Sequence, residues 1–430
     1  MRSNRGRAIV GIALALSLVV AACGRSEESS GGESSGGGNA NAGNPPAGVP
    51  GFDGTTISLG VLTPQTGLAA TIGDPLTAGN QLYFDRVNAA GGIAGKYKVQ
   101  LVPKDTEYRA EKAVQEYAAT KDSVAMYVQI LGTAIQEAIL VEQETDEILS
   151  GPATLDAEWV RNPLLMPIGA PYQIQAINGL DYAIRELDAA NSTVCAMTKD
   201  DLYGQAGLGG LEYAAEQAGI TIAAKQTFRQ GDQDYTAQIG ALTSAGCEIV
   251  WLTSLPTETI PMMTGASTQG FAPTWIANSP AWTSLLGAGE LGPYLAENFL
   301  LMSEGPQWGD TSVPGMAQML EDIKAYAPDQ TANVYFAFGY AQAWAAAQVL
   351  EKAVALGDLS QAGIVSAASQ ITELTFGGLV GDYTYGPAAD RNPPRASSVF
   401  AVDPTSTATG FLVGVEINQT SQAASEYQIP

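Results

Sequence analysis

The reactive side chains in this chain of 430 residues are mainly carboxylates, because histidine is absent and cysteine is rare. It has three cysteines, Cys23, Cys195 and Cys247, and no histidine. Without histidine, Ser-His-Asp catalysis, Cys-His catalysis and His-ligated zinc sites are excluded. The remaining reactive chemistry belongs to the thiols and to 44 Asp and Glu residues.

Glycine-rich and acidic stretches do not add an enzyme motif. In the run Gly207 to Gly210, the G-x-G-x-x-G spacing places Glu212 where a dinucleotide loop needs its third glycine. Walker A and calcium-binding loops do not occur in the sequence, and no pair of carboxylates is marked out for catalysis. We therefore expect a protein that is not an enzyme and uses no cofactor or metal; a secreted hydrolase is the remote alternative.

Cys23 follows the basic start "MRSNRGR" and an apolar run at positions 8–22, a pattern typical of an export signal. The run is short for a membrane span. Val20-Ala21-Ala22-Cys23 resembles a bacterial lipobox, in which the chain is cut before the cysteine and the thiol receives a diacylglycerol. We expect a signal peptide at 1–22 and a lipid anchor on Cys23 at the outer face of the cytoplasmic membrane. The alternative is an ordinary secretory signal in which Cys23 is incidental.

The other two cysteines lie in or beside predicted strands, and an exported protein occupies a compartment that permits disulfides. Spacing alone does not set the distance between their sulfur atoms. Cys195 and Cys247 therefore either form a disulfide or remain two buried thiols.

The amino-acid composition of residues 23–55 differs from that of the rest of the chain. Residues 23–55 are mostly Gly, Ser, Asn, Glu and Pro, with too few apolar side chains to offset the entropy of ordering. We expect a flexible tether. The roughly 375 residues that follow exceed what one hydrophobic core usually serves, so two domains are expected.

The charge of the chain limits its partners. The formal net charge is −24; without the three arginines of the leader, 17 basic residues remain against 44 acidic ones, which gives −27. Such a chain repels phosphate backbones, and no Lys/Arg cluster interrupts it. Nucleic acid is therefore not expected as a partner.

From residue 56, apolar β-branched runs alternate with amphipathic helical stretches, a pattern typical of α/β proteins with parallel sheets covered by helices. The runs are "TISLGVL", "KYKVQLV", "SVAMYVQI", "EILSG", "STVCAMT", "ITIAAKQTF", "CEIVWLTS" and "PTWIANS". Two blocks, 56–169 and 170–304, are interpreted as similar open α/β domains. The tail from about 378 is interpreted as a separate β-rich element.

Two helices can be placed from their end signals. Asp74 and Pro75 predict the start of the first helix, and Gly91-Gly92 predicts its end. Its apolar stripe is expected to pack in the core; the stripe consists of Leu76, Gly79, Tyr83 and Val87. A second long apolar helix is predicted over 333–357.

One long stretch carries a family resemblance. Residues 57–105, "ISLGVLTPQTGLAATIGDPLTAGNQLYFDRVNAAGGIAGKYKVQLVPKD", resemble the leucine/isoleucine/valine-binding family of type I substrate-binding proteins. The likeness continues through "EKAVQEYAATKD", "LYGQAGLGGLEYAAEQAGI" and "GDQDYTAQIGALTSAGCEIVWL" and covers nearly all of the mature chain. The family works with the permease subunits of ABC importers and is habitually monomeric.

The resemblance implies two open parallel-sheet lobes that close on a small ligand, the type I periplasmic binding protein fold. The N-terminal lobe would comprise 56–169 and 305–377, and the C-terminal lobe 170–304 and 378–430. Three crossings between the lobes are expected, near Gly169 to Pro171, Ser303 to Pro306 and Gly378 to Asp382.

Candidate ligand-binding residues lie beyond the carboxyl ends of the predicted strands, where open sheets bind ligands. The three first-lobe loops there are Pro64 to Gly73, Leu131 to Thr133 and Gly151 to Thr154. Gly132 and Thr133 lie where a helix begins, so the hydroxyl and free amides of its first turn can hold a carboxylate. The resemblance assigns that role to Thr133, Ala153 and Thr154, and a ligand-facing role to Tyr203. Helix capping is the alternative for each threonine.

The chain departs from the family pattern where amino acids would be recognised. Ser279 stands where the family has a glutamate for the ammonium group, and Ile72 and Leu255 replace aromatic residues. A buried ammonium without a carboxylate would cost several kcal/mol, on the order of the penalty for burying an unpaired charge. Either Glu258 or Asp201 takes over, or the ligand has no ammonium group.

Two tryptophans are further candidates for the pocket wall. Trp282 and Trp251 are close enough in sequence to line an apolar pocket, although core packing is the simpler interpretation for Trp251. We expect a lipoprotein that captures a small polar or carboxylate-bearing molecule, such as an amino acid, an amide or an organic or aromatic acid, for an ATP-driven importer. A lipid-anchored sensor that reports the ligand to a membrane partner is the alternative.

Overall fold

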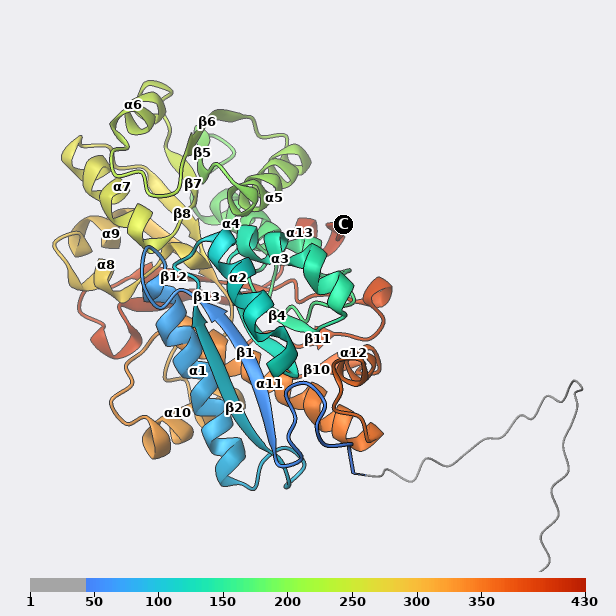
Figure 1. The fold of residues 1–430 in the computed structure, drawn as a ribbon. Helices are drawn as coiled ribbons and strands as arrows, with labels where there is room; N and C mark the ends of the chain where they lie inside the picture. Colours follow the sequence, from blue (N-terminus) through green and yellow to red (C-terminus); the bar gives the residue numbers. More distant parts are fainter. Residues whose placement is uncertain (1–43) are drawn as a thin grey trace, which may run out of the picture. The chain divides into compact units, whose positions relative to one another are not determined.

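The computed structural model describes residues 44–430, and the predicted signal peptide, Cys23 and most of the tether lie outside this range. Strands and helices alternate along most of it (Figure 1). Each of the eight apolar runs named above contains a strand, so those predictions are confirmed. Between Asn44 and Pro430, no helix combines the length and the hydropathy that a membrane span requires.

A four-stranded parallel sheet forms the centre of the first lobe, in the order β2-β1-β3-β4. Its strands are β1 (Thr56–Thr63), β2 (Lys98–Asp105), β3 (Met126–Leu131) and β4 (Ser150–Ala153). The helices of this lobe are α1 (Ala70–Ala89), α2 (Ala110–Thr120), α3 (Thr133–Asp146), α10 (Pro314–Tyr326), α11 (Val334–Leu356) and α12 (Gln361–Ser369). The family-based expectation that 305–377 return to the first lobe agrees with the packing of α10 and α11 on α1 (Figure 1).

A seven-stranded sheet forms the second lobe, in the order β13-β12-β9-β8-β7-β5-β6. Its strands are β5 (Val194–Lys199), β6 (Ile222–Phe228), β7 (Ile249–Thr253), β8 (Thr274–Asn278), β9 (Phe299–Ser303), β12 (Ser397–Val402) and β13 (Leu412–Gln419). The first five pair in parallel, and β12 and β13 add antiparallel at one edge. The helices are α4 (Tyr172–Glu186), α5 (Leu202–Ala218), α6 (Thr236–Ser244), α7 (Pro256–Thr268), α8 (Ser284–Ala288), α9 (Gly292–Asn298) and α13 (Gln422–Glu426).

The C-terminal tail is not a separate element, which corrects the interpretation above. Strands β12 and β13 extend the second sheet, because Val399, Phe400 and Val402 bury their side chains there. The small sheet of β10 (Glu373–Leu374) and β11 (Tyr383–Thr384) belongs with the first lobe, since Tyr383 and Tyr385 pack in its core. The third passage between the lobes therefore lies between Tyr385 and Ser397, after the predicted Gly378–Asp382.

The end of the predicted tether is already part of the packed chain. Phe52 is 2% exposed and stacks edge-on against Tyr97, with ring centroids 5.0 Å apart. The N–H of Ser58 donates to the carbonyl of Gly51 at 2.7 Å. Residues near 55, which the composition placed in the tether, are thus held on the first lobe.

Helix α1 begins at Ala70, one turn before the predicted start at Asp74. The N–H of Gly73 donates to the carbonyl of Ala69 at 2.9 Å, so the first turn closes upstream of Pro75, which lies inside the helix. The expected end is confirmed, because the helix stops at Ala89 and Gly91 follows with a φ of +114°.

Close packing between α1 and α11 holds the two distant parts of the first lobe together. A Cβ on Gly79 of α1 would lie 2.1 Å from the carbonyl oxygen of Phe336, and a Cβ on Gly339 of α11 would lie 1.9 Å from that of Leu76. Only glycine allows such an approach of two helix backbones. The predicted helix over 333–357 is confirmed, with Asn333 capping the N–H groups of Tyr335 and Phe336.

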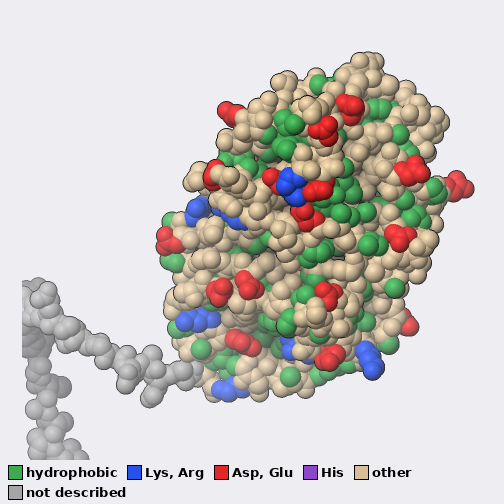
Figure 2. Space-filling model, turned by 180° about the vertical axis from the view of Figure 1, so that it is seen from behind, with side chains coloured by type: hydrophobic (Ala, Val, Ile, Leu, Met, Phe, Trp, Pro, Cys, Tyr) green, Lys and Arg blue, Asp and Glu red, His purple; other side chains and the backbone are tan. Residues whose placement is uncertain are grey.

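Acidic residues outnumber basic ones in the sequence, and several surface charges are paired. On the face shown in Figure 2, acidic side chains are scattered, and one group of basic side chains lies directly beside acidic ones. This distribution matches the acidic net charge of the sequence.

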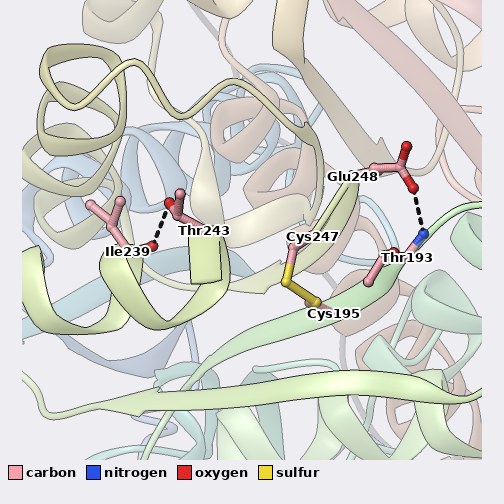
Figure 3. Close-up of a disulfide and its surroundings, with 6 residues drawn as sticks. All are labelled: Thr193, Cys195, Ile239, Thr243, Cys247 and Glu248. Carbon is pink, nitrogen blue, oxygen red and sulfur yellow. Dashed lines mark hydrogen bonds between the residues drawn. A yellow bond between two sulfur atoms is a disulfide. The ribbon is translucent and has the colours of Figure 1, made fainter. Parts of the chain in front are cut away.

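Cys195 and Cys247 are joined by a disulfide within the second lobe (Figure 3). Cys195 lies in β5 and Cys247 just before β7, which pairs with β5, so their Cα atoms are 5.8 Å apart. Both side chains are buried. The parallel pairing of the two strands brings the cysteines together although 52 residues separate them.

Removing this disulfide should destabilise the second lobe. A closed loop of this length is expected to contribute about 4 kcal/mol by restricting the unfolded chain. We expect the double variant Cys195→Ser, Cys247→Ser to melt at a lower temperature than the wild type, as measured by thermal unfolding followed by circular dichroism. Dithiothreitol should lower the wild-type melting temperature and leave that of the variant unchanged; an equal response of both would contradict the assignment.

Candidate ligand-binding site

A large cavity lies between the two lobes and takes its walls from both. It comprises about 1110 Å³ of space between atoms, part of it open to solvent. Ile72 and Leu76 of α1, Tyr203 of α5 and Leu255 before α7 are among its lining residues. Most of the lining is aliphatic or aromatic, as in sites that bind small organic molecules.

The start of α3 forms a polar end of this cavity. Gly132 and Thr133 line it, together with Ala153 at the end of β4. Gly132, the N-cap residue, has a φ of +113° and no side chain to cap the helix, so the amides of the first turn are available to an anion. Thr133 and Thr154 share a hydrogen bond of 2.6 Å between their Oγ1 atoms. Thr154 does not line the cavity; it orients the Thr133 hydroxyl from behind.

Tyr203 and Ser279 contribute to the wall from the second lobe. The Tyr203 hydroxyl lies 3.0 Å from the carbonyl oxygen of Ser254 and 2.9 Å from Oδ1 of Asn278, so its proton is already engaged. Ser279 begins a short 3₁₀ helix (Ser279–Ala281). Its N–H donates to Oε1 of Gln175 at 3.1 Å, and its Oγ accepts from Nε2 of the same residue at 3.3 Å. Neither residue supplies a negative charge.

The lobes touch each other at Tyr108, which follows β2 and lines the cavity. Its carbonyl oxygen accepts from Nε2 of Gln230 at 3.4 Å, and the Lys199 ammonium lies 5.2 Å from its ring centroid. Tyr108 has a φ of +57°, an uncommon value for a residue with a side chain. These contacts join loops of opposite lobes beside the cavity.

The sequence matches the family model of the periplasmic binding proteins over residues 56–408. The chain belongs to this family. The resemblance seen in the sequence and the predicted type I periplasmic binding protein fold are therefore confirmed.

Individual relatives of this periplasmic binding protein are distant. The "Amino acid binding protein" of Pseudomonas aeruginosa is 23% identical over 251 residues, 57% of this chain and 66% of that protein. "Leu/Ile/Val-binding protein homolog 8" of Brucella abortus is 23% identical over 313 residues, 68% of this chain and 76% of that protein. The solved structure of a fatty acid ABC transporter substrate-binding protein from Thermomonospora curvata has a TM-score of 0.81 at 26% identity, covering 89% of this chain and 97% of that chain.

Glu258 and Asp201, the two candidate partners for a ligand ammonium group, do not line the cavity. Glu258 accepts from the N–H of Leu255 at 2.9 Å and caps α7, while Asp201 accepts from the N–H of Gly204 at 3.0 Å and caps α5. Both carboxylates face Lys199, at 3.8 Å and 3.2 Å from its Nζ. The side chain of Lys199 is 1% exposed, so these acids compensate a buried charge of the protein itself. Burial raises the pKa of Glu258, and Lys199 opposes that rise.

The two tryptophans also lie outside the main cavity. Trp251 is buried against α4 and donates from Nε1 to Oγ1 of Thr253 at 3.0 Å, so it is a core residue. Trp282 lines a smaller adjacent pocket, which shares Trp308, Val334 and other residues with the main one. The main cavity thus continues toward the start of α11.

Glu304 is an acidic residue of the cavity wall that was not among the predicted site residues. It directly follows β9, within the predicted second crossing, and lines the cavity. Burial raises its pKa to about 7, against the lowering effect of the N–H groups of Ala170 and Gly381. The sequence contains one signal for it, an acidic residue inside the predicted crossing Ser303 to Pro306. Among residues 44–430, no group of three His, Cys, Asp or Glu side chains could hold a metal ion.

The raised pKa of Glu304 predicts how stability depends on pH. Between its ordinary value of 4.5 and about 7, the folded protein keeps a proton that the unfolded chain releases, so this group destabilises the fold as pH rises. Glu304→Gln removes the effect. We expect the variant to gain about 2 kcal/mol relative to wild type between pH 5 and pH 8, measured by urea denaturation.

The exposed Glu290 provides a matched control for that experiment. Glu290→Gln should track the wild type at both pH values. A stability difference between Glu304→Gln and wild type that is the same at pH 5 and pH 8 would show that Glu304 ionises normally.

Proposed function

We propose that this periplasmic binding protein is a lipid-anchored, monomeric receptor that delivers a carboxylic acid with an aliphatic chain to the permease of an ABC importer. The observation that supports the proposal is the composition of the cavity. A hydroxyl and free amides at the start of α3 form a site for a carboxylate, and aliphatic and aromatic side chains form most of the remaining wall.

The position that the family uses for an ammonium group does not favour a branched-chain amino acid here, and Glu304 is the acidic residue among those that line the cavity. Ser279 brings no charge to the site, and Glu258 and Asp201 are engaged with Lys199. Ile72 and Leu255 present aliphatic surface at two further positions. The structural relative from Thermomonospora curvata, whose name specifies fatty acids, supports an aliphatic ligand. In this proposal the lobes close over the ligand, and the closed form docks on the permease.

Alkanoates of increasing length test the proposed ligand class. Each buried CH₂ group contributes about 0.8 kcal/mol, so the dissociation constant should fall about fourfold per carbon until the cavity is filled. Isothermal titration calorimetry of the purified protein with the acids from hexanoate to hexadecanoate measures this series. Leucine binding more tightly than every alkanoate would refute the proposal.

Thr133→Val tests the carboxylate end of the site. The variant keeps the shape of the side chain but loses the hydroxyl, and a hydrogen bond to a charged group should change alkanoate affinity by about tenfold. The dependence on chain length should stay the same, because the apolar wall is unchanged. Thr145→Val, an exposed position in the same helix, should bind like wild type. An unchanged affinity of Thr133→Val would place the carboxylate elsewhere.

The proposed lipid anchor has its own test. Cells grown with an alkyne-tagged fatty acid should label the wild-type protein, and Cys23→Ser should lose the label because the acceptor thiol is gone. The double variant Cys195→Ser, Cys247→Ser should keep it. Labelling that persists in Cys23→Ser would show that Cys23 is not the lipidated residue.

A further inference from the structure

A second, smaller pocket adjoins the main cavity near the start of α11. It comprises about 310 Å³ of space between atoms, part of it open to solvent. Five of its eleven lining residues also line the main cavity, namely Trp308, Val334, Tyr335, Thr409 and Leu412. The two spaces therefore meet at these five residues.

The smaller pocket shares no lining residue with the polar end of the main cavity. Gly132, Thr133 and Ala153 line the main cavity only, whereas Ser284 and Ala332 line the smaller pocket only. A ligand whose carboxylate binds at the start of α3 therefore reaches the smaller pocket with its opposite end.

The walls of the smaller pocket suit an uncharged, apolar group. None of its lining side chains is charged, and the largest are the indoles of Trp282 and Trp308. The Asn333 amide oxygen accepts from two N–H groups in the first turn of α11, at 2.9 Å and 3.2 Å. Thr409 donates from Oγ1 to the carbonyl of Ser406 at 3.0 Å. The other polar lining residues carry hydroxyl groups only. A hydrocarbon group is stabilised there by leaving water, whereas an ionised group would have no charged partner.

Both lobes contribute to the smaller pocket. Trp282 and Ser284 belong to the second lobe, and Ala332 precedes α11 of the first lobe. The Tyr335 hydroxyl donates to the carbonyl oxygen of Pro280 at 3.0 Å and to that of Trp282, so the start of α11 is bonded to the second lobe beside this pocket. A ligand end in the pocket therefore contacts both lobes.

We propose that the smaller pocket holds the hydrocarbon end of the substrate, and that the substrate is a long-chain carboxylic acid that spans both spaces. This inference rests on the proposed function, because that function places the carboxylate at the start of α3. The residues common to both spaces then surround the distal part of the chain. The residues that line only the smaller pocket determine which chain lengths bind best.

Variants that fill the smaller pocket test the inference. Ser284→Phe adds a ring from the second lobe at a half-buried position, and Ala332→Leu adds a branched side chain from the first lobe. Each variant is titrated by calorimetry with the alkanoates from hexanoate to hexadecanoate. Both should bind short acids like the wild type and lose affinity beyond one common chain length. Because each buried CH₂ group changes affinity about fourfold, an acid two carbons beyond that length should bind about sixteenfold more weakly than to the wild type.

Ala288→Phe and Ala408→Leu are the matched controls. Both alanines are exposed and line neither space. Ala288 lies in α8 with Ser284, and Ala408 directly precedes Thr409. The two control variants should follow the wild type at every chain length.

A measurement on the unchanged protein applies if the filled variants do not fold. Bromine quenches tryptophan fluorescence on contact, and Trp282 and Trp308 line the smaller pocket. The ω-bromo derivative of the best-binding alkanoate should therefore quench the fluorescence of the protein more than the 2-bromo isomer, whose bromine lies next to the carboxylate. Equal quenching by the two isomers would overturn the inference.

The possible outcomes separate this inference from the proposed function. If no alkanoate binds to the wild type, the proposed function fails. If alkanoates bind but both filled variants keep wild-type affinity at every length, or lose it equally for short and long acids, the inference alone is overturned. Tighter binding of long dicarboxylic acids than of the monocarboxylic acids of the same length would also contradict a hydrocarbon end in this pocket.

Discussion

The close contact between α1 and α11 is the interaction on which the arrangement of the site depends. Gly79 and Gly339 each face the backbone of the other helix. The two helix backbones therefore touch with no side chain between them. This contact draws a segment more than 200 residues downstream back onto the first sheet. The chain must then leave the second lobe after β9 and re-enter it at β12. The crossing that carries Glu304 exists because of this return.

The cavity combines two environments that favour different parts of a ligand. At the start of α3, amides and a hydroxyl stabilise negative charge without a cationic side chain. Elsewhere the wall is largely aliphatic and aromatic, so most of the binding free energy has to come from buried apolar area. Such a site distinguishes ligands by chain length and by the positions of a few polar groups, because hydrophobic contacts are not directional.

Two sets of buried ionisable side chains, one around Lys199 and one at Glu304, lie in different environments. Lys199 pairs with Glu258 and Asp201 within the second lobe, and its ammonium group also faces the ring of Tyr108 of the first lobe. Glu304, by contrast, lies in the wall of the cavity, and its carboxyl group accepts a hydrogen bond from the N–H of Ala170. The first arrangement supports a contact between the lobes, whereas the second ties two of the crossings between them together.

Local patterns in the sequence determined the elements and one end of the site. The alternating runs predicted eight strands, Asn333 and Gly357 lie at the ends of the predicted long helix, and Thr133 lies at a helix start as expected. These features depend on residues a few positions apart, so spacing is sufficient to read them. The start of α1 was misplaced because Pro75 is also tolerated one turn further into the helix.

Only the tertiary structure decided which distant residues meet. It joined Cys195 to Cys247, packed Tyr383 and Tyr385 in the first lobe, and turned Glu258 toward Lys199 instead of the cavity. It also placed Glu304 in the wall of the cavity. The sequence contains each of these residues, but their partners are fixed by sheet order and helix packing, which bring together segments that no local pattern relates.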